Sequence, residues 1–224
     1  MSTVLHQTLS HHSLRPKNLG IIRHKKSWLL NLDLIVLSDS GNIYDAMFMA
    51  ARAALWDTKV PRTRSVEYKA MKGGTMWRER GDDDMDMDAG IRSGFDTRQY
   101  TNKATDFELP DYWDEGEVLD GRDKWPVCVT LNLLPPIHYL DATLQEETST
   151  PLRFLIMFSF ASPSSPDVQG MRLLGGGELT LALMKDLVKE GEKFARQVFA
   201  ALNAKLKDED VRRNQKARDR FSRR

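Results

Sequence analysis

The chain has 224 residues, of which 41% are hydrophobic and 29% charged, and this composition is ordinary for a soluble protein with one large domain. The formal net charge of +1 gives no overall field for or against a nucleic-acid partner, and the single cysteine, Cys128, excludes an internal disulfide framework and a multi-cysteine zinc site. The longest apolar runs, about ten residues, are too short to span a bilayer, and the N-terminus has no signal-peptide core, so we expect an intracellular, soluble protein without a membrane partner.

Residues 1–20 favour the end of a helix followed by a turn, because Pro16 breaks any longer helix. Three histidines cluster here: His6, His11 and His12. No nearby cysteine, aspartate or glutamate completes a metal-ligand set, so we interpret them as exposed histidines without a metal role.

Residues 28–37 alternate regularly and are largely apolar on both faces, which predicts a strand covered on both sides. Residues 38–42 are turn formers that stop it. Residues 43–56 are rich in alanine, methionine and leucine and contain no glycine or proline, which predicts a buried helix. Asp45 and Arg52 stand out in this helix because so little around them is polar.

An alternating stretch at 62–68 predicts a short edge strand, after which the composition changes. Several glycines and an acidic run at 82–88 interrupt residues 69–106, which we interpret as a disordered acidic insertion. The acidic run lacks the glycine at the sixth position and the glutamate at the twelfth that an EF-hand calcium loop needs. A solvated loop is therefore the better hypothesis for it.

β-rich runs bounded by proline or glycine predict further strands at 125–134, 137–140, 152–160 and 168–174, the first two forming a hairpin. Cys128 lies within the first of these runs, which favours a core thiol over a nucleophile. The glycines at 175–177 lack the lysine and serine or threonine of a phosphate loop, so we interpret them as a turn.

Residues 179–206 carry an apolar stripe at helical spacing with a charged opposite face, which predicts a long amphipathic helix. From residue 211 the chain is strongly basic and almost without apolar residues, so we expect a mobile or partner-bound tail. The predicted order of elements indicates a mixed sheet with helices on one side, an α/β (α+β, two-layer) domain.

The separated motifs WLLNLDLIVLSDSGNIYDAMFMAARAAL, DTKVPR and VCVTLNLLPPIHYLDATLQEE occur in this order before the paired strands and the long helix. In this order they resemble the RNase PH-like subunits of the RNA exosome ring. The connector LDATLQEE at 140–147 and the strand-turn-helix with Asp33, Gly41, Asn42 and Asp45 carry most of the resemblance. It covers about residues 20–206 apart from the insertion.

The resemblance implies a ribosomal-protein-S5-domain-2-like fold in a six-membered ring, through which RNA reaches a separate hydrolytic nuclease. It implies a non-catalytic structural subunit that supports 3′-to-5′ RNA processing and degradation, including rRNA maturation and mRNA turnover. The implied partners are the other RNase PH-like ring subunits, S1/KH cap subunits, the associated nuclease and RNA. No cofactor is implied, and the expected location is the nucleus with its nucleolus and the cytoplasm.

The chain departs from the family pattern at its start, because the β-rich opening half of the family's domain has no counterpart here. We therefore expect an N-terminally incomplete domain: a remnant helix end and loop at 1–26, the RNase PH-like domain with its insertion at 27–206, and a basic tail at 207–224. Without that half, the strand at 28–37 is expected to expose apolar surface, which promotes interaction or aggregation.

Active phosphorolytic relatives carry a further aspartate shortly after the acidic connector and a Ser-Arg phosphate site. Here the residues after Glu147 include no acid through Arg153, and a glycine run follows the last strand. The alternative is a phosphate-dependent 3′-to-5′ exoribonuclease, or half of a composite site, in which Asp141, Glu146 and Glu147 hold a magnesium ion. A third hypothesis is a truncated product without activity.

Arginines provide the candidates for RNA contact in this chain. Arg62 and Arg64 follow the helix predicted at 43–56, and Arg212 and Arg213 begin the basic tail. Guanidinium groups bind phosphate oxygens through charge-assisted hydrogen bonds, without specifying a sequence.

Overall fold

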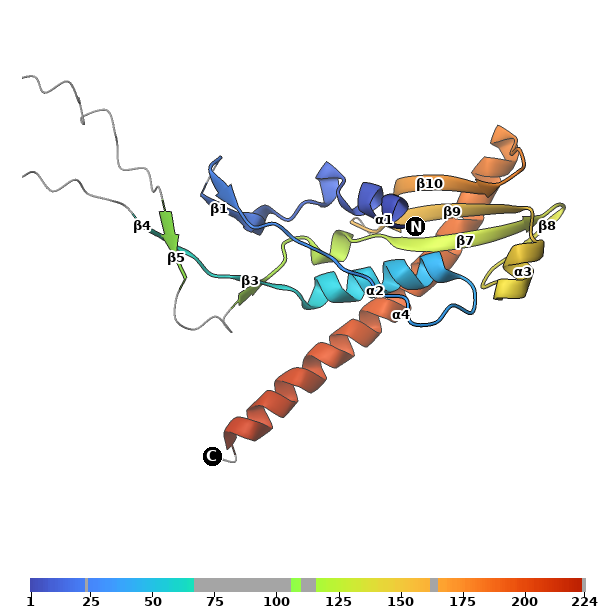
Figure 1. The fold of residues 1–224 in the computed structure, drawn as a ribbon. Coiled ribbons are helices and arrows are strands. Elements are labelled where there is room, and N and C mark those ends of the chain that lie inside the picture. The colour runs from blue at the N-terminus through green and yellow to red at the C-terminus, as the bar shows by residue number, and fades with distance from the viewer. Residues whose placement is uncertain (23, 67–105, 110–115, 162–164, 223–224) are drawn as a thin grey trace, which may run out of the picture. The chain divides into compact units, whose positions relative to one another are not determined.

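The computed structural model describes residues 1–22, 24–66, 106–109, 116–161 and 165–222 (Figure 1). The chain divides into two compact units. The larger unit consists of Met1–Leu19, Leu29–Val60 and Glu117–Arg224. The smaller unit consists of Gly20–Trp28 and Pro61–Gly116.

The larger unit contains a four-stranded antiparallel sheet in the order β10-β9-β7-β8. Its strands are β7 (Val127–Leu134), β8 (Ile137–Tyr139), β9 (Leu152–Ser159) and β10 (Asp167–Gly175). The register pairs Val127 with Phe158 and Leu133 with Leu152. All four predicted strands are thus confirmed, and Gly175, with φ +107°, ends β10 at the predicted turn.

Helices cover both faces of this sheet. Helix α4 (Leu181–Ser222) packs on the face that contains Val127, Val129, Leu131 and Leu133. Phe48 of α2 (Ile43–Asp57) packs on the other face, against Cys128, Leu155 and Met157. Alternate side chains of a strand point to opposite faces, so α2 and α4 lie on opposite sides. The α/β class is confirmed, but the sheet is antiparallel rather than mixed and is covered on both faces rather than one.

The N-terminal segment forms α1 (Ser2–Leu9) and two 3₁₀ turns, η1 (His12–Leu14) and η2 (Lys17–Leu19). The predicted helix end and turn are therefore confirmed. Val4 and Leu5 of α1 pack against the cluster formed by Phe48 and Cys128. Cys128 is 1% exposed, as expected for a core thiol.

The predicted strand at 28–37 is wrong, because the structure forms no regular element there. The alternation survives: Leu30, Leu32 and Leu34 are half-buried, while Leu29 and Ile35 are 82% and Leu37 is 94% exposed. A strand needs ladder hydrogen bonds to a neighbour, and no described strand pairs with this segment. The expected exposure of apolar surface is confirmed.

The smaller unit contains two short pairs of antiparallel strands. β1 (Gly20–Ile22) pairs with β2 (Lys26–Ser27), and β4 (Arg64–Val66) pairs with β5 (Asp106–Glu108). The predicted edge strand at 62–68 is confirmed over Arg64–Val66. The predicted insertion, including the acidic run at 82–88, lies outside the described residues, apart from Asp106.

Two further elements lie where the chain changes unit. β3 (Lys59–Pro61) and β6 (Gly116–Val118) form a two-stranded sheet. The 3₁₀ turn η4 (Arg122–Lys124) then leads into β7.

Helix α4 continues well beyond the predicted end at Leu206 and reaches Ser222, so the expected mobile tail is helical here. No glycine or proline follows Gly191 within the helix, and its second half consists largely of good helix formers. Arg212 also pairs with Glu209 at 2.6 Å, a spacing that stabilises helices. Among the described residues, no helix has the length and apolarity needed to cross a membrane.

Candidate functional site

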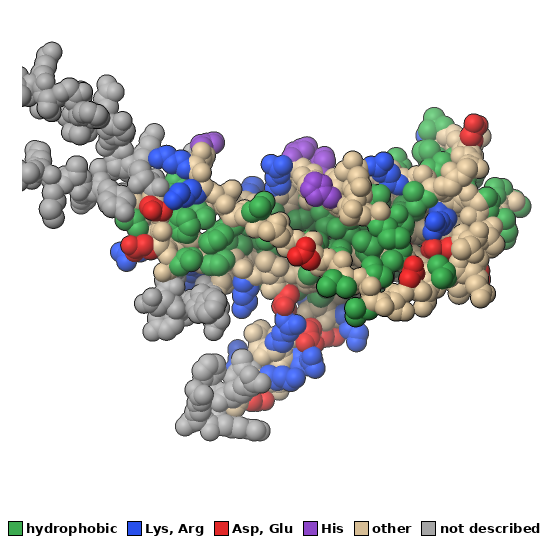
Figure 2. Space-filling model, viewed as in Figure 1, with side chains coloured by type: hydrophobic (Ala, Val, Ile, Leu, Met, Phe, Trp, Pro, Cys, Tyr) green, Lys and Arg blue, Asp and Glu red, His purple; other side chains and the backbone are tan. Residues whose placement is uncertain are grey.

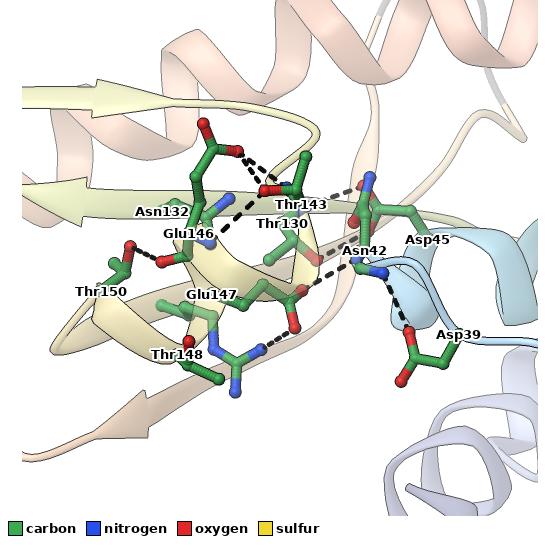
Figure 3. A network of polar contacts seen from close by, with 12 residues as sticks. Asp39, Asn42, Asp45, Thr130, Asn132, Thr143, Glu146, Glu147, Thr148 and Thr150 are labelled. Atoms are coloured by element: carbon green, nitrogen blue, oxygen red, sulfur yellow. Dashed lines mark hydrogen bonds and ion pairs between the residues drawn. The ribbon is translucent and has the colours of Figure 1, made fainter.

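Polar side chains gather where the N-terminus of α2 meets β7 and the segment between β8 and β9 (Figure 3). This segment includes α3 (Leu144–Ser149) and the acidic connector. The cluster therefore combines the two motifs that carry the family resemblance.

Gly41 allows the loop before α2 to lie directly on the connector. Its φ is +107°, and a Cβ atom there would lie 2.2 Å from the carbonyl oxygen of Ala142. The Leu144 amide donates to the Ser40 carbonyl at 3.0 Å. Only glycine combines this backbone angle with so close an approach.

Asn42 and Glu147 join this loop to α3. The Asn42 amide donates to Oε1 of Glu147 at 2.9 Å, and its Nδ2 donates to Oδ1 of Asp141 at 3.3 Å. Arg153 of β9 pairs with Glu147 at 2.8 Å, and the side chain of Glu147 is only 10% exposed. The Glu147 carboxylate thus lies at the positive end of α2, where an anion is stabilised.

Helix α3 begins with a capping box. Thr143 accepts a hydrogen bond from the Glu146 amide at 3.4 Å, and Oε2 of Glu146 accepts one from the Thr143 amide at 2.8 Å. The hydrogen bonds from the Thr143 backbone and side chain lower the pKa of Glu146. Glu146 is therefore committed to the start of α3.

Asp45 extends the cluster onto the sheet. The hydroxyl of Thr130 donates to Oδ1 of Asp45 at 2.7 Å, and the Thr130 amide donates to Oδ2 at 3.2 Å. Burial raises the pKa of Asp45, against the opposing effect of these hydrogen bonds. Burial also raises the pKa of Cys128 well above its usual value, so the thiol remains protonated at neutral pH.

Two buried amide oxygens in this region have no hydrogen-bond partner among the described residues: Oδ1 of Asn42 and Oδ1 of Asn132. Asn132 is 1% exposed, and its Nδ2 donates to the Tyr139 carbonyl at 3.4 Å. Both unpartnered atoms are acceptors, as are the nearby carboxylates.

The three acids of the magnesium alternative do not form one site. Asp141 accepts from Asn42, Glu146 caps α3 and Glu147 pairs with Arg153. Within the described ranges, no three His, Cys, Asp or Glu side chains form a group that could hold a metal ion. Each acid already satisfies a donor of the chain itself.

The four predicted arginines lie in different units. Arg62 and Arg64 are exposed in the smaller unit. Arg212 and Arg213 are exposed in the larger unit, where Arg212 pairs with Glu209 and Arg213 pairs with Asp57.

A second polar cluster, between α2 and α4, was not expected from the sequence. Arg52 is 1% exposed and donates to the carbonyl of Trp125 and, at 2.8 Å, to Oδ1 of Asn203. Its guanidinium carbon lies 4.3 Å from the centre of the Phe199 ring. Burial lowers the pKa of Arg52 to about 10, so it remains charged at neutral pH.

The same cluster continues at the end of α2. Nε1 of Trp56 donates to Oδ2 of Asp210 at 3.0 Å, and Arg122 lies 4.0 Å above the Trp56 ring. Arg122 also approaches Asp210 at 3.9 Å. Together with the Asp57–Arg213 pair, these contacts, which we call the α2–α4 latch, fix α4 against α2.

Sequence reasoning missed Thr130, Arg153, Asn203 and Asp210 as partners in these clusters. One signal was present: Thr143 and Glu146 form the T-x-x-E pattern of a capping box. The other partners depend on contacts between distant segments, such as the separation of 154 residues between Trp56 and Asp210.

Comparison with known proteins adds to this geometry. Residues 1–61 match the family described as 3′ exoribonuclease family, domain 1. RRP42 of Dictyostelium discoideum, whose name describes an exosome complex exonuclease, is 29% identical over 131 residues, which are 57% of this chain and 29% of that protein. The exosome complex component Rrp42 of Methanothermobacter thermautotrophicus is 44% identical over 45 residues, 20% of this chain and 17% of that protein.

These matches confirm the resemblance to RNase PH-like proteins that the motifs indicated, and both relatives carry the name Rrp42. The chain spans less than a third of the length of the curated relatives it matches, at 29% and 17%. The family match includes the loop with Gly41 and all of α2, so one half of the polar cluster lies within it.

Proposed function

We propose that the chain serves as a non-catalytic, structural subunit of an RNA exosome ring. In this role it supports 3′-to-5′ RNA processing and degradation, including rRNA maturation and mRNA turnover. Two relatives named Rrp42 and the match to an exoribonuclease family domain support the ring assignment. The nucleus, its nucleolus and the cytoplasm are the proposed locations.

The observation that best supports a non-catalytic role is that each acid of the connector already binds a group of the chain itself. Phosphorolysis needs cationic and metal-bound partners for inorganic phosphate and for the charge that develops on the phosphoryl group. Here Asp141, Glu146 and Glu147 instead hold the loop before α2, the start of α3 and Arg153. An Arg–Glu pair beside the N-terminus of α2 already fills the position where that helix would favour an anion.

The residues that follow the connector support the same proposal. Thr148, Ser149 and Thr150 donate their hydroxyl hydrogen bonds to carbonyls of α3 itself, at 2.7 to 2.9 Å. They therefore stabilise a helix end and supply no further acid. Thr150 also bonds to the hydroxyl of Tyr139 in β8.

A phosphorolysis assay tests the catalytic part of the proposal. The purified chain is incubated with labelled single-stranded RNA, inorganic phosphate and Mg²⁺, and nucleoside diphosphates are measured. We expect no release above that of a mock purification. Asp39, whose Oδ1 accepts from the Gly41 amide at 2.9 Å, is the control carboxylate. Release that Asp141→Asn abolishes and Asp39→Asn preserves would overturn the proposal in favour of the phosphorolytic alternative.

Affinity purification followed by mass spectrometry tests the assembly part. The tagged chain should recover other RNase PH-like ring subunits, S1/KH cap subunits and a hydrolytic nuclease. A tagged chain with Gly41→Val is the control, because a side chain there would collide with the backbone of Ala142 and detach the connector. Recovery of no ring subunit by the unaltered chain contradicts the assignment.

A further inference from the structure

The second half of α4 continues past the α2–α4 latch as a helix with a highly polar surface. Figure 1 shows it running beyond α2 toward the C-terminus, and Figure 2 shows basic and acidic side chains along it. Among the described positions from 207 onward, one large hydrophobic residue, Val211, is exposed, with 65% of its surface accessible to solvent. We call residues 207–219 the arm.

The arm is fixed in direction by the latch. Asp210 accepts from Trp56 at 3.0 Å, and Arg213 pairs with Asp57. Arg212 is held within the helix by Glu209, through bonds of 2.6 and 2.8 Å. These two arginines therefore already have carboxylate partners.

Three other cations of the arm are exposed: Lys207, Lys216 and Arg218. None of them forms an ion pair with another described residue. Helical spacing places Lys207 and Arg218 on one face with Asn214, whereas Lys216 lies on a different face with Arg212. The free cations thus occupy more than one side of about 16 Å of helix.

This distribution distinguishes between classes of partner. A helix that lies on a membrane or in a protein groove needs an apolar stripe, and Val211 is the one large apolar residue among the described side chains of the arm. Cations on several faces suit a ligand with negative charge around the helix, such as a folded or wrapping phosphate backbone. We propose that the arm binds the RNA phosphate backbone through Lys207, Lys216 and Arg218, while Arg213 positions it; the assignment to RNA rests on the proposed function.

Fluorescence anisotropy with labelled single-stranded oligouridine tests this site in the full-length chain. The variant Lys207→Gln/Lys216→Gln/Arg218→Gln removes three charges while keeping helix formers. The slope of log K against log salt is negative, and each lost contact to a single strand reduces its magnitude by about 0.7. We therefore expect the magnitude of the slope to fall by about two between roughly 50 and 200 mM salt.

The matched control is Lys185→Gln/Lys189→Gln/Lys193→Gln, which removes the same charge from exposed positions of the same helix over the sheet. Its salt slope should equal that of the unaltered chain. If both triple variants have the same salt slope, whether or not it differs from that of the unaltered chain, the proposal is wrong. It is also wrong if polyglutamate competes for the arm as effectively as unlabelled oligouridine does, because this result indicates an acidic protein partner. Recovery of ring subunits in the purification above is measured independently, so failure of the arm and failure of the ring assignment are distinguishable.

Discussion

Asp45 lies in the first turn of α2 and faces Thr130 of β7, which donates two hydrogen bonds to its carboxylate. A carboxylate near a helix N-terminus is stabilised by the helix dipole, but loss of solvent opposes ionisation. Burial is the larger effect here and raises the pKa of Asp45. Ionisation of Asp45 therefore reduces the stability of the fold.

The consequence is a testable dependence of stability on pH. Since the folded pKa of Asp45 exceeds its unfolded value, the stability contributed by protonated Asp45 is complete below the unfolded pKa, near 3.9, and is lost as the pH rises through the folded pKa. Asp45→Asn cannot titrate, so its free energy of unfolding should rise relative to the unaltered chain across that window. Each pH unit between the two pKa values is worth about 1.4 kcal/mol.

Urea unfolding at several pH values from about 3.5 to 7 measures this difference. Thr130→Val is the companion variant: it removes a hydrogen bond that lowers the pKa of Asp45, so the window should extend to higher pH. Parallel stability curves for Asp45→Asn and the unaltered chain would show that Asp45 does not titrate differently on folding.

The sequence indicates which residues of α2 are unusual but not what they bind. Asp45 and Arg52 are visible as polar residues in an apolar helix, and both are structurally important. Their partners Thr130 and Asn203 lie 85 and 151 residues away in the chain. Such partners follow from the packing of α2 against β7 and α4, which no local pattern encodes.

At the scale of the element, the predicted and observed structures agree where a segment finds the burial and the hydrogen-bonding neighbours that its sequence pattern calls for. The run at 127–134 is buried on both faces, is bounded by proline and has a strand on either side, so it forms β7 as expected. Helix α4 was predicted only as far as its apolar stripe. Its second half lacks that stripe and depends on helix propensity, ion pairs and the latch.

The latch therefore provides a prediction about α4. Trp56→Phe keeps an aromatic ring beneath Arg122 but removes the N–H donor to Asp210. Losing a hydrogen bond to a charged, partly buried acceptor costs about 1.5 to 3 kcal/mol. For a chain of this size, each kcal/mol lowers Tm by roughly 2 to 4 °C.

Circular dichroism melting and amide hydrogen exchange measure the effect. Exchange should accelerate mainly from residue 205 onward, since Leu202 is the last α4 side chain in the core cluster over the sheet. Asp210→Asn retains an acceptor for Trp56 and should cost less. If exchange in the arm is unchanged in Trp56→Phe, helix propensity and not the latch maintains the second half of α4.

At the scale of the whole molecule, the larger unit has a sheet covered on both faces, yet the segment at 28–37 remains unpaired. Its sequence predicts a strand because alternation and apolar content reflect the environment in which a segment is stable. Whether a partner strand is available is not a property of the segment itself. The structure accordingly retains the alternation and lacks the strand.

The exposed apolar side chains of this segment should govern how the chain behaves in solution. Leu29 and Ile35 are 82% exposed and Leu37 is 94% exposed. Leu29→Ser/Ile35→Ser/Leu37→Ser should raise the monomer fraction in light scattering at a given concentration, because it removes apolar surface that associates. Tm should change little, since these side chains bury almost nothing within the chain.

The half-buried neighbours on the other side of the segment provide the matched control. Leu30→Ser/Leu32→Ser changes the same residue type in the same segment but removes contacts within the chain. It should lower Tm without raising the monomer fraction, because the exposed face is unchanged. The opposite result would be a lower Tm for the variant at Leu29, Ile35 and Leu37 and an unchanged Tm for the variant at Leu30 and Leu32. It would mean that the side chains of Leu29, Ile35 and Leu37 pack against the chain in solution and those of Leu30 and Leu32 do not.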